Sequence, residues 1–211
     1  MVVFACKWSL KPYIWGLSVY LLAVMNITHA VQILHHWDNQ GRVVFTHQDM
    51  ATLFPQEGLK TLSKSLERLV RSGLLVRACR GVYVNAVATT RDGRLLEHIA
   101  VALRRGEYNY VSLESMLSEF GAISQVPMDR ITVMTTGRKG EYRTPFGVIE
   151  FTHTSRSVTD ILAATSKSAL RPLRMASPET AWRDLKRVGR NTHMVNTQMI
   201  STQEIACAKR V

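Results

Sequence analysis

The sequence predicts an α+β protein with two parts in series, on the basis of three observations. Its 211 residues are enough for one large domain or two small ones, and a hydrophobic fraction of 46% is typical of a folded chain. Segments with helical spacing alternate with short extended segments. The formal net charge of +11 favours a polyanionic partner such as DNA, RNA or an anionic membrane surface, although such a surplus can also serve solubility alone.

The first 25 residues form an apolar extension. Its segment Tyr13–Met25 is almost continuously apolar, but a helix needs roughly 20 residues to cross a bilayer. A signal peptide is one interpretation, because Lys7 and Lys11 precede the run and Thr28–Ala30 could follow a cleavage site. We favour an additional helix, or an over-long start with Met25 as an alternative initiator, because the helical pattern continues through that site.

Residues 26–90 begin with two helices and a short strand. Asn26–Gly41 has apolar residues at helical spacing and ends in turn residues, which predicts a helix. Val43–Phe45 predicts a short strand or extended link. Thr46 is the expected N-cap of a second, short helix, with Asp49 in its first turn and Pro55 as its stop.

A third helix is predicted after this turn, and its two faces differ in chemistry. The apolar stripe consists of Leu59, Leu62, Leu66, Leu69, Val70 and Gly73. Within about 50° of the opposite direction project Lys60, Thr61, Lys64, Arg68 and Arg71. Glu67 is the only acid among the six basic residues between Lys60 and Arg80. A merely solvated helix face is the alternative interpretation, but such a face usually carries more acids.

The segment Leu74–Asn85 predicts a β-hairpin around Gly81. Helix, strand, short helix, basic helix and basic hairpin together form the layout of a winged helix-turn-helix. In that fold the third helix enters the major groove and the hairpin lies along phosphates or the minor groove. Short Thr61, Ser63 and Ser65 would allow close approach and bond to phosphate or a base edge. The expected DNA-binding residues are Thr46, Lys60, Thr61, Ser63, Lys64, Arg68, Arg71, Arg77 and Arg80.

Residues 91–211 predict a second, small mixed α+β domain, with a boundary near Asn85–Gly93. A helix with an apolar stripe from Leu95 to Leu103 precedes an extended segment, Tyr108–Val111. Ser112 is the expected N-cap of the next helix, which Gly121 ends. Strands are then predicted for Arg130–Gly137 and, as two pieces around a turn, for Glu141–Thr154. The last clear helix has Ser177 as its N-cap, Pro178 at its first position and Gly189 after its end. From Asn191 the chain is polar, with at most one more short helix.

The chain has no recognisable catalytic or cofactor-binding motif. His29 and His36 are too far apart in sequence for a metal-binding pair, and Ser112 lies in no nucleophile elbow. A phosphate-binding glycine loop and the motif of a nucleotidyltransferase are also missing. Cys6, Cys79 and Cys207 form no CxxC, which argues against a zinc site or a disulfide framework and fits a reducing cytoplasm. We therefore expect no enzyme activity, no cofactor and no metal.

Four segments in order resemble the AbiEi family of antitoxins: Leu69–Val84, Tyr110–Pro127, Ile131–Gly137 and Ala176–Leu185. The likeness extends from about Ile27 to Val188. It implies an N-terminal winged helix-turn-helix that binds inverted repeats in its own promoter and represses it. It also implies a C-terminal α+β antitoxin domain that counters a nucleotidyltransferase-like toxin, typically without a stable complex, in a type IV toxin–antitoxin pair often found on mobile elements. By position, Lys60, Thr61, Ser63, Lys64 and Arg68 match the recognition helix, and Arg77 and Arg80 match the wing.

Two alternatives stay open at this point. The chain is shorter than typical members of that family, with little after the helix that begins at Pro178. It could therefore be a plasmid- or mobile-element-borne transcription regulator without antitoxin activity. A DNA-binding component of a nucleic-acid-processing enzyme is the less favoured alternative. Inverted repeats would imply a homodimer on DNA, and no membrane partner is expected.

Overall fold

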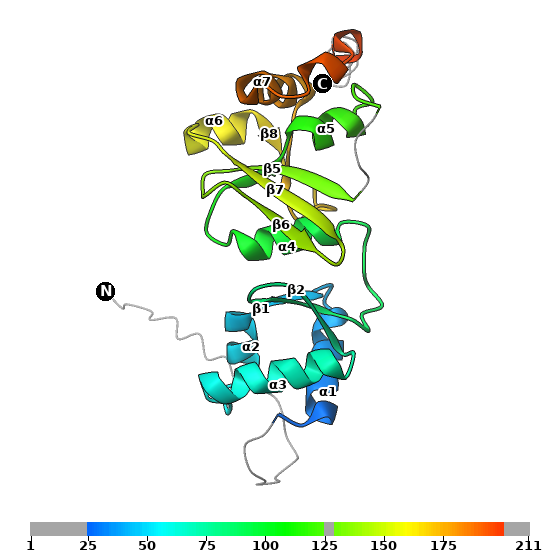
Figure 1. Ribbon diagram of the computed structural model, residues 1–211, viewed down its shortest axis with the longest axis vertical. Coiled ribbons are helices and arrows are strands. Elements are labelled where there is room, and N and C mark those ends of the chain that lie inside the picture. Colours follow the sequence, from blue (N-terminus) through cyan, green and yellow to red (C-terminus); the bar gives the residue numbers. More distant parts are fainter. Residues whose placement is uncertain (1–24, 125–128, 201–211) are drawn as a thin grey trace, which may run out of the picture.

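The computed structural model describes residues 25–124 and 129–200, and it confirms the predicted α+β class (Figure 1). N-terminal helices pack on a small antiparallel sheet, and a mixed six-stranded sheet with its own helices follows. Apart from Met25, the predicted apolar helix lies outside the described residues. None of the described helices is long and apolar enough to span a bilayer.

The N-terminal part, residues 25–90, has the element order expected of a winged helix-turn-helix. Its elements are α1 (Ile27–Asp38), β1 (Val44–Thr46), α2 (His47–Leu53), α3 (Leu59–Arg71), β2 (Leu75–Cys79) and β3 (Val82–Asn85). The strands pair antiparallel in the order β1-β3-β2. Gly81 forms the hairpin turn with φ of +77°, and Gly73 follows α3 with the same value. An L-residue rarely adopts this conformation, so glycine is favoured at both positions.

The C-terminal part, residues 91–200, is built on a six-stranded sheet. Its elements are α4 (Leu95–Leu103), β4 (Asn109–Val111), α5 (Leu113–Glu119), β5 (Arg130–Thr135), β6 (Gly140–Thr144), β7 (Gly147–His153), α6 (Val158–Ala163), β8 (Thr165–Ser166), β9 (Arg174–Ala176), α7 (Pro178–Val188) and a 3₁₀ turn (Thr192–Met194). The strand order is β6-β7-β5-β4-β9-β8, with β4 parallel to β9 and β5 parallel to β7. The helix α4 lies on the side nearer the N-terminal part, while α5, α6 and α7 lie at the far end (Figure 1).

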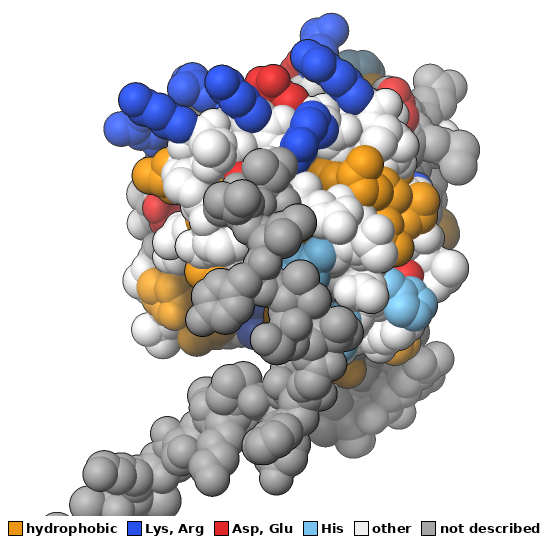
Figure 2. All heavy atoms as spheres, turned by 90° about the horizontal axis from the view of Figure 1, so that it is seen from below, with side chains coloured by type: hydrophobic (Ala, Val, Ile, Leu, Met, Phe, Trp, Pro, Cys, Tyr) orange, Lys and Arg blue, Asp and Glu red, His pale blue; other side chains and the backbone are white. Residues whose placement is uncertain are grey.

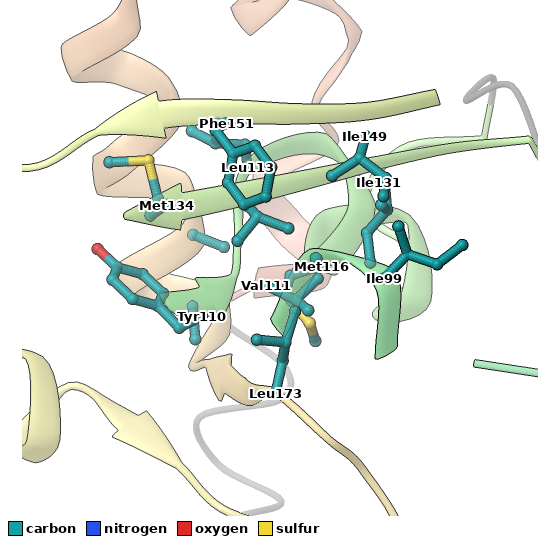
Figure 3. Packing of buried hydrophobic residues seen from close by; sticks show 14 of the residues in the cluster. Ile99, Tyr110, Val111, Leu113, Met116, Ile131, Met134, Ile149, Phe151 and Leu173 are labelled. Carbon is teal, nitrogen blue, oxygen red and sulfur yellow. The ribbon is translucent and has the colours of Figure 1, made fainter. Parts of the chain in front are cut away.

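Of two hydrophobic clusters, one joins the N-terminal and C-terminal parts. The inner face of the small sheet packs on α1–α3 through residues such as Phe45 and Leu75. Its other face contributes Val44, Val82 and Val84 to the cluster that also contains Ile99 of α4. In Figure 3, Ile99 lies beside Ile131 and Ile149, which face each other on β5 and β7. The small sheet is therefore buried on both faces, which ties the hairpin to the second sheet through α4.

The predicted place of Ser112 at the start of a helix is confirmed, but the capping bond expected of its side chain is not formed. Ser112 occupies the N-cap position of α5, but its side chain makes no capping hydrogen bond. It is fully buried and donates instead to the Asp184 carboxylate at 2.8 Å, beside the Tyr110 hydroxyl, which donates to the same oxygen at 3.1 Å. Arg156 donates to the other oxygen of Asp184 at 2.5 Å. The sequence shows the serine before a helix but not the aspartate that lies 72 residues away.

The buried Tyr110 predicts an alkaline limit to stability. Burial and, after it, the negative charge of Asp184 together raise the pKa of its hydroxyl to about 12. A raised pKa in the folded state gives stability that is complete below the unfolded value of about 10 and lost as the pH rises toward 12. In urea unfolding, wild type should have a free energy of unfolding about 1 kcal/mol higher than that of Tyr110→Phe at pH 8. This difference should shrink as the pH rises from about 10 toward 12. A difference that stays constant up to pH 12 would contradict this assignment.

Candidate nucleic-acid interface

The helix α3 presents a cationic face because its apolar residues are drawn into the core. Leu62, Leu66 and Leu69 are buried, while Lys60, Lys64 and Arg71 are exposed on other faces of the helix. None of these three cations forms an ion pair with another described residue. Figure 2 views this end of the molecule and shows Lys and Arg side chains gathered along one edge, with an acidic side chain among them.

A groove of about 550 Å³ separates α3 from the β2–β3 hairpin. Its lining residues with polar or charged side chains are His47, Ser63, Glu67, Arg71, Arg77, Arg80 and Tyr83. Ser63, Glu67 and Arg71 follow one another at intervals of four, so they occupy one flank of α3. Arg77 and Arg80 approach from the hairpin, and Gly81 closes the groove at the turn. The structure thus brings together four of the predicted residues, namely Ser63, Arg71, Arg77 and Arg80.

Lys60, Lys64, Arg71, Arg77 and Arg80 form what we call the basic surface. All five are exposed, and none forms an ion pair with another described residue. Two other arginines of the N-terminal part form contacts within the protein. Arg42 pairs with Asp49 at 2.7 Å, and Arg68 donates to a backbone carbonyl and to a serine hydroxyl. The positive charge that remains unneutralised therefore lies along α3 and the hairpin.

Four of the predicted residues form hydrogen bonds within the N-terminal part, and one of them is Ser63, whose hydroxyl donates to the Leu59 carbonyl at 3.3 Å. The Thr46 hydroxyl accepts from the Asp49 N–H at 3.1 Å, and the Thr46 N–H donates to the Asp49 carboxylate at 2.8 Å, which completes a capping box at the start of α2. The Thr61 hydroxyl donates to the Gly58 carbonyl at 2.7 Å. Arg68 Nη2 donates to the Met25 carbonyl and to Ser65 Oγ, both at 3.1 Å. Arg68 is thus held on the flank of α3 that faces the start of α1, away from the groove.

The expectation that Ser65 lets DNA approach is wrong, and so is the placement of Leu59 in the core. Ser65 is only 4% exposed and donates to both carboxylate oxygens of buried Glu57 at 3.1 Å, while Met25 N–H donates to Glu57 as well. This links α3 to the turn before it. Leu59 is 70% exposed, because the first turn of α3 extends beyond the core.

The groove contains two residues that sequence reasoning missed. His47 Nε2 lies 3.3 Å from Ser63 Oγ, which connects the start of α2 with α3. Glu67 is exposed in the groove and has no ion pair with another described residue, although arginines line the same groove. The four-residue spacing of Ser63, Glu67 and Arg71 could have placed Glu67 on the same flank of α3.

Asp49 connects this region to the C-terminal part. Its carboxylate accepts from Arg42 at 2.7 Å and from Arg105, just after α4, at 2.9 Å. Burial alone would raise the pKa of Asp49, but hydrogen bonds from Thr46, Arg42 and Arg105 lower it to about 2. The carboxylate is therefore charged at neutral pH and fixes the start of α2 against the end of α4.

Within residues 25–124 and 129–200, no three His, Cys, Asp or Glu side chains are grouped so that they could hold a metal ion. The residues of the candidate interface supply charges and hydrogen-bonding groups. Its geometry suits a long, negatively charged partner better than a small molecule, because the basic surface continues from α3 across the open groove to the hairpin.

Neither a family model nor a curated protein matches this sequence. The structure is similar to the crystal structure of the Rv2827c protein from Mycobacterium tuberculosis, with a TM-score of 0.50 and 17% sequence identity. The similarity covers 74% of this chain and 59% of that protein, so the chain spans less than two thirds of its length. At this identity the likeness concerns the fold.

Proposed function

We propose that the protein is a sequence-specific DNA-binding transcriptional regulator. In this proposal α3 lies in the major groove and the β2–β3 hairpin contacts the neighbouring backbone. The observation that supports it best is the basic surface, whose five cations have no ion-pair partners among the described residues. An ordinary solvated face would gain from neutralising such charges with nearby acids.

The affinity would come mainly from the release of counterions condensed on DNA. Each cation placed near a phosphate contributes about 0.9 to the slope of log affinity against log salt concentration. Lys60 and Lys64, which lie nearly opposite the buried leucines, would enter the major groove of the DNA with α3. Arg77 and Arg80 on the hairpin would contact phosphates, which positions the protein without reading sequence.

The resemblance to AbiEi antitoxins extends the proposal to autoregulation and toxin neutralisation. The protein would repress its own promoter through inverted repeats, as a homodimer on DNA, and its C-terminal part would counter a nucleotidyltransferase-like toxin without a stable complex. Co-expression with the product of a neighbouring nucleotidyltransferase gene tests the second role. Restored growth would support the antitoxin function, whereas continued arrest together with promoter repression would favour a regulator without it.

Replacing Arg80 with alanine should weaken binding to all DNA sequences alike. Arg80 is exposed at the tip of the hairpin beside Gly81, so it is placed for a phosphate and not for a base edge. We expect the salt slope to fall by about one unit, measured by fluorescence anisotropy on operator and unrelated duplexes. A loss confined to the operator would mean that the hairpin reads sequence instead.

Replacing Glu67 with glutamine should raise affinity for unrelated DNA and reduce discrimination between sequences. The unpaired carboxylate of Glu67 repels DNA phosphates. It can also accept a hydrogen bond from the amino group of a cytosine in the major groove of the DNA. The expected result is tighter binding to random duplexes and a ratio of operator to random affinity that falls by about tenfold. Selection from a random DNA pool with each protein measures this, and an unchanged consensus would exclude a reading role for Glu67.

A further inference from the structure

A second basic hollow lies between α6 and α7, at the end of the molecule remote from α3 (Figure 1). It has a volume of about 580 Å³ and is lined by Arg156, Arg183, Arg187, Thr180, Asp160 and Glu179, among others. Arg183 and Arg187 are exposed one turn apart on α7, and neither forms an ion pair with another described residue. The first turn of α7 adds little to this charge, because Pro178 has no N–H and the N–H groups of Thr180 and Ala181 are bonded to Ser177.

The third arginine of the hollow is buried and incompletely paired. The Arg156 side chain is 8% exposed, and its Nη2 donates to Asp184 at 2.5 Å. Its Nη1 is buried and has no hydrogen-bond partner among the described residues. A buried guanidinium nitrogen without an acceptor costs free energy, and an anion in the hollow would supply that acceptor. This nitrogen is an observation independent of the helix terminus.

An apolar groove of about 550 Å³ adjoins the basic hollow. The two share the lining residues Ala163, Ala164, Ser177 and Glu179. The remaining walls of the groove include Met116, Phe120 and Met175. Glu179 stands at the junction, and its carboxylate makes no hydrogen bond to another described residue. The combined depression has a cationic end, an apolar end and a hydrogen-bond acceptor between them.

We propose that this depression binds a nucleoside phosphate. The phosphates would lie against Arg156, Arg183 and Arg187, since guanidinium groups suit phosphate oxygens. The base would enter the apolar groove beside Met116 and Phe120, and ribose hydroxyls would donate to Glu179. An inorganic anion would use only the basic end, and an uncharged nucleoside only the apolar end.

Isothermal titration of the full-length chain with ADP tests the proposal. We expect saturable binding of ADP, and binding of pyrophosphate and of adenosine that is weaker by about tenfold or more, because each fills half of the site. The double variant Arg183→Ala/Arg187→Ala should weaken ADP binding by about tenfold or more. The control is Lys186→Ala on the same helix, which removes one charge against two in the double variant. The Lys186 ammonium lies over the Trp182 ring at 5.2 Å and does not line either hollow.

Several results would overturn the proposal. Absence of ADP binding at millimolar concentration would do so, as would equal affinity for pyrophosphate, which would mean an adventitious ion only. Equal affinities for ADP and adenosine would show that only the apolar groove binds the ligand. An equal loss of ADP affinity in Lys186→Ala and in the double variant would show that net charge, and not the two arginines, causes the loss. The proposal does not rest on DNA binding, and the double variant should retain the wild-type affinity for DNA.

Discussion

Replacing Lys60, Lys64 and Arg71 together with alanine will reduce the affinity for operator DNA by roughly 10²–10³-fold at about 0.1 M salt. All three side chains are exposed and lie opposite or beside the buried leucines of α3. They form no ion pair with other described residues, so their loss leaves no carboxylate unpaired. The affinity should fall because three counterion-releasing contacts are lost, and the salt slope should decrease by about three units.

Anisotropy titrations across a salt series measure both quantities, and circular dichroism checks that the fold is intact. The matched control removes Arg183, Lys186 and Arg187, three exposed cations of α7 at the other end of the molecule. The control has the same change in net charge as the α3 variant. Equal losses in the two variants would show that overall charge, and not the placement of α3, determines DNA affinity.

Replacing Asp184 with alanine will lower the free energy of unfolding by about 3–5 kcal/mol. Asp184 is fully buried and accepts hydrogen bonds from Tyr110, Ser112 and Arg156. Its removal would leave the guanidinium of Arg156 buried without its counter-charge and two hydroxyls without their acceptor. Such uncompensated burial of a charge is far more costly than the loss of an exposed pair.

Urea denaturation of wild type and variant gives this difference directly. Glu67→Ala serves as the control, because Glu67 is exposed and has no partner among the described residues, and it should change the free energy of unfolding by about 0.5 kcal/mol or less. A loss below about 1 kcal/mol for Asp184→Ala would place it in the range of exposed pairs. The buried cluster would then not stabilise the C-terminal part as described.

Elements with local signals could be predicted from the sequence. The helix α7 begins after Ser177, whose side chain accepts from the Thr180 N–H, and it ends at Gly189 with φ of +74°. The capping box of Thr46 and Asp49 likewise involves residues only three apart. These features depend on chemistry within one turn of the chain, which a single sequence contains.

Elements that depend on distant partners could not be predicted. The strand β8 has two residues and β9 has three, and β9 is defined by its parallel pairing with β4 and antiparallel pairing with β8. So short a segment has no readable periodicity.

The candidate site was predicted only in part, for a related reason. Helical spacing placed Lys60, Lys64 and Arg71 on the outside of α3, because the leucines fix which face is buried. It did not reveal that Ser65 would turn inward to Glu57, or that Arg68 would bind the Met25 carbonyl, because both partners belong to segments before α3. The groove with Glu67 depends on how the hairpin packs against α3, which spacing within one helix does not show.

A footprint of the purified protein on the DNA upstream of its own gene tests the central claim most directly. We predict protection of an inverted repeat at low salt, with half-sites separated by a whole number of helical turns, and loss of that protection in the Lys60, Lys64 and Arg71 variant. Absence of protection at about 50 mM salt, or equal protection by wild type and variant, would contradict the assignment of α3 and the hairpin as a DNA-binding surface.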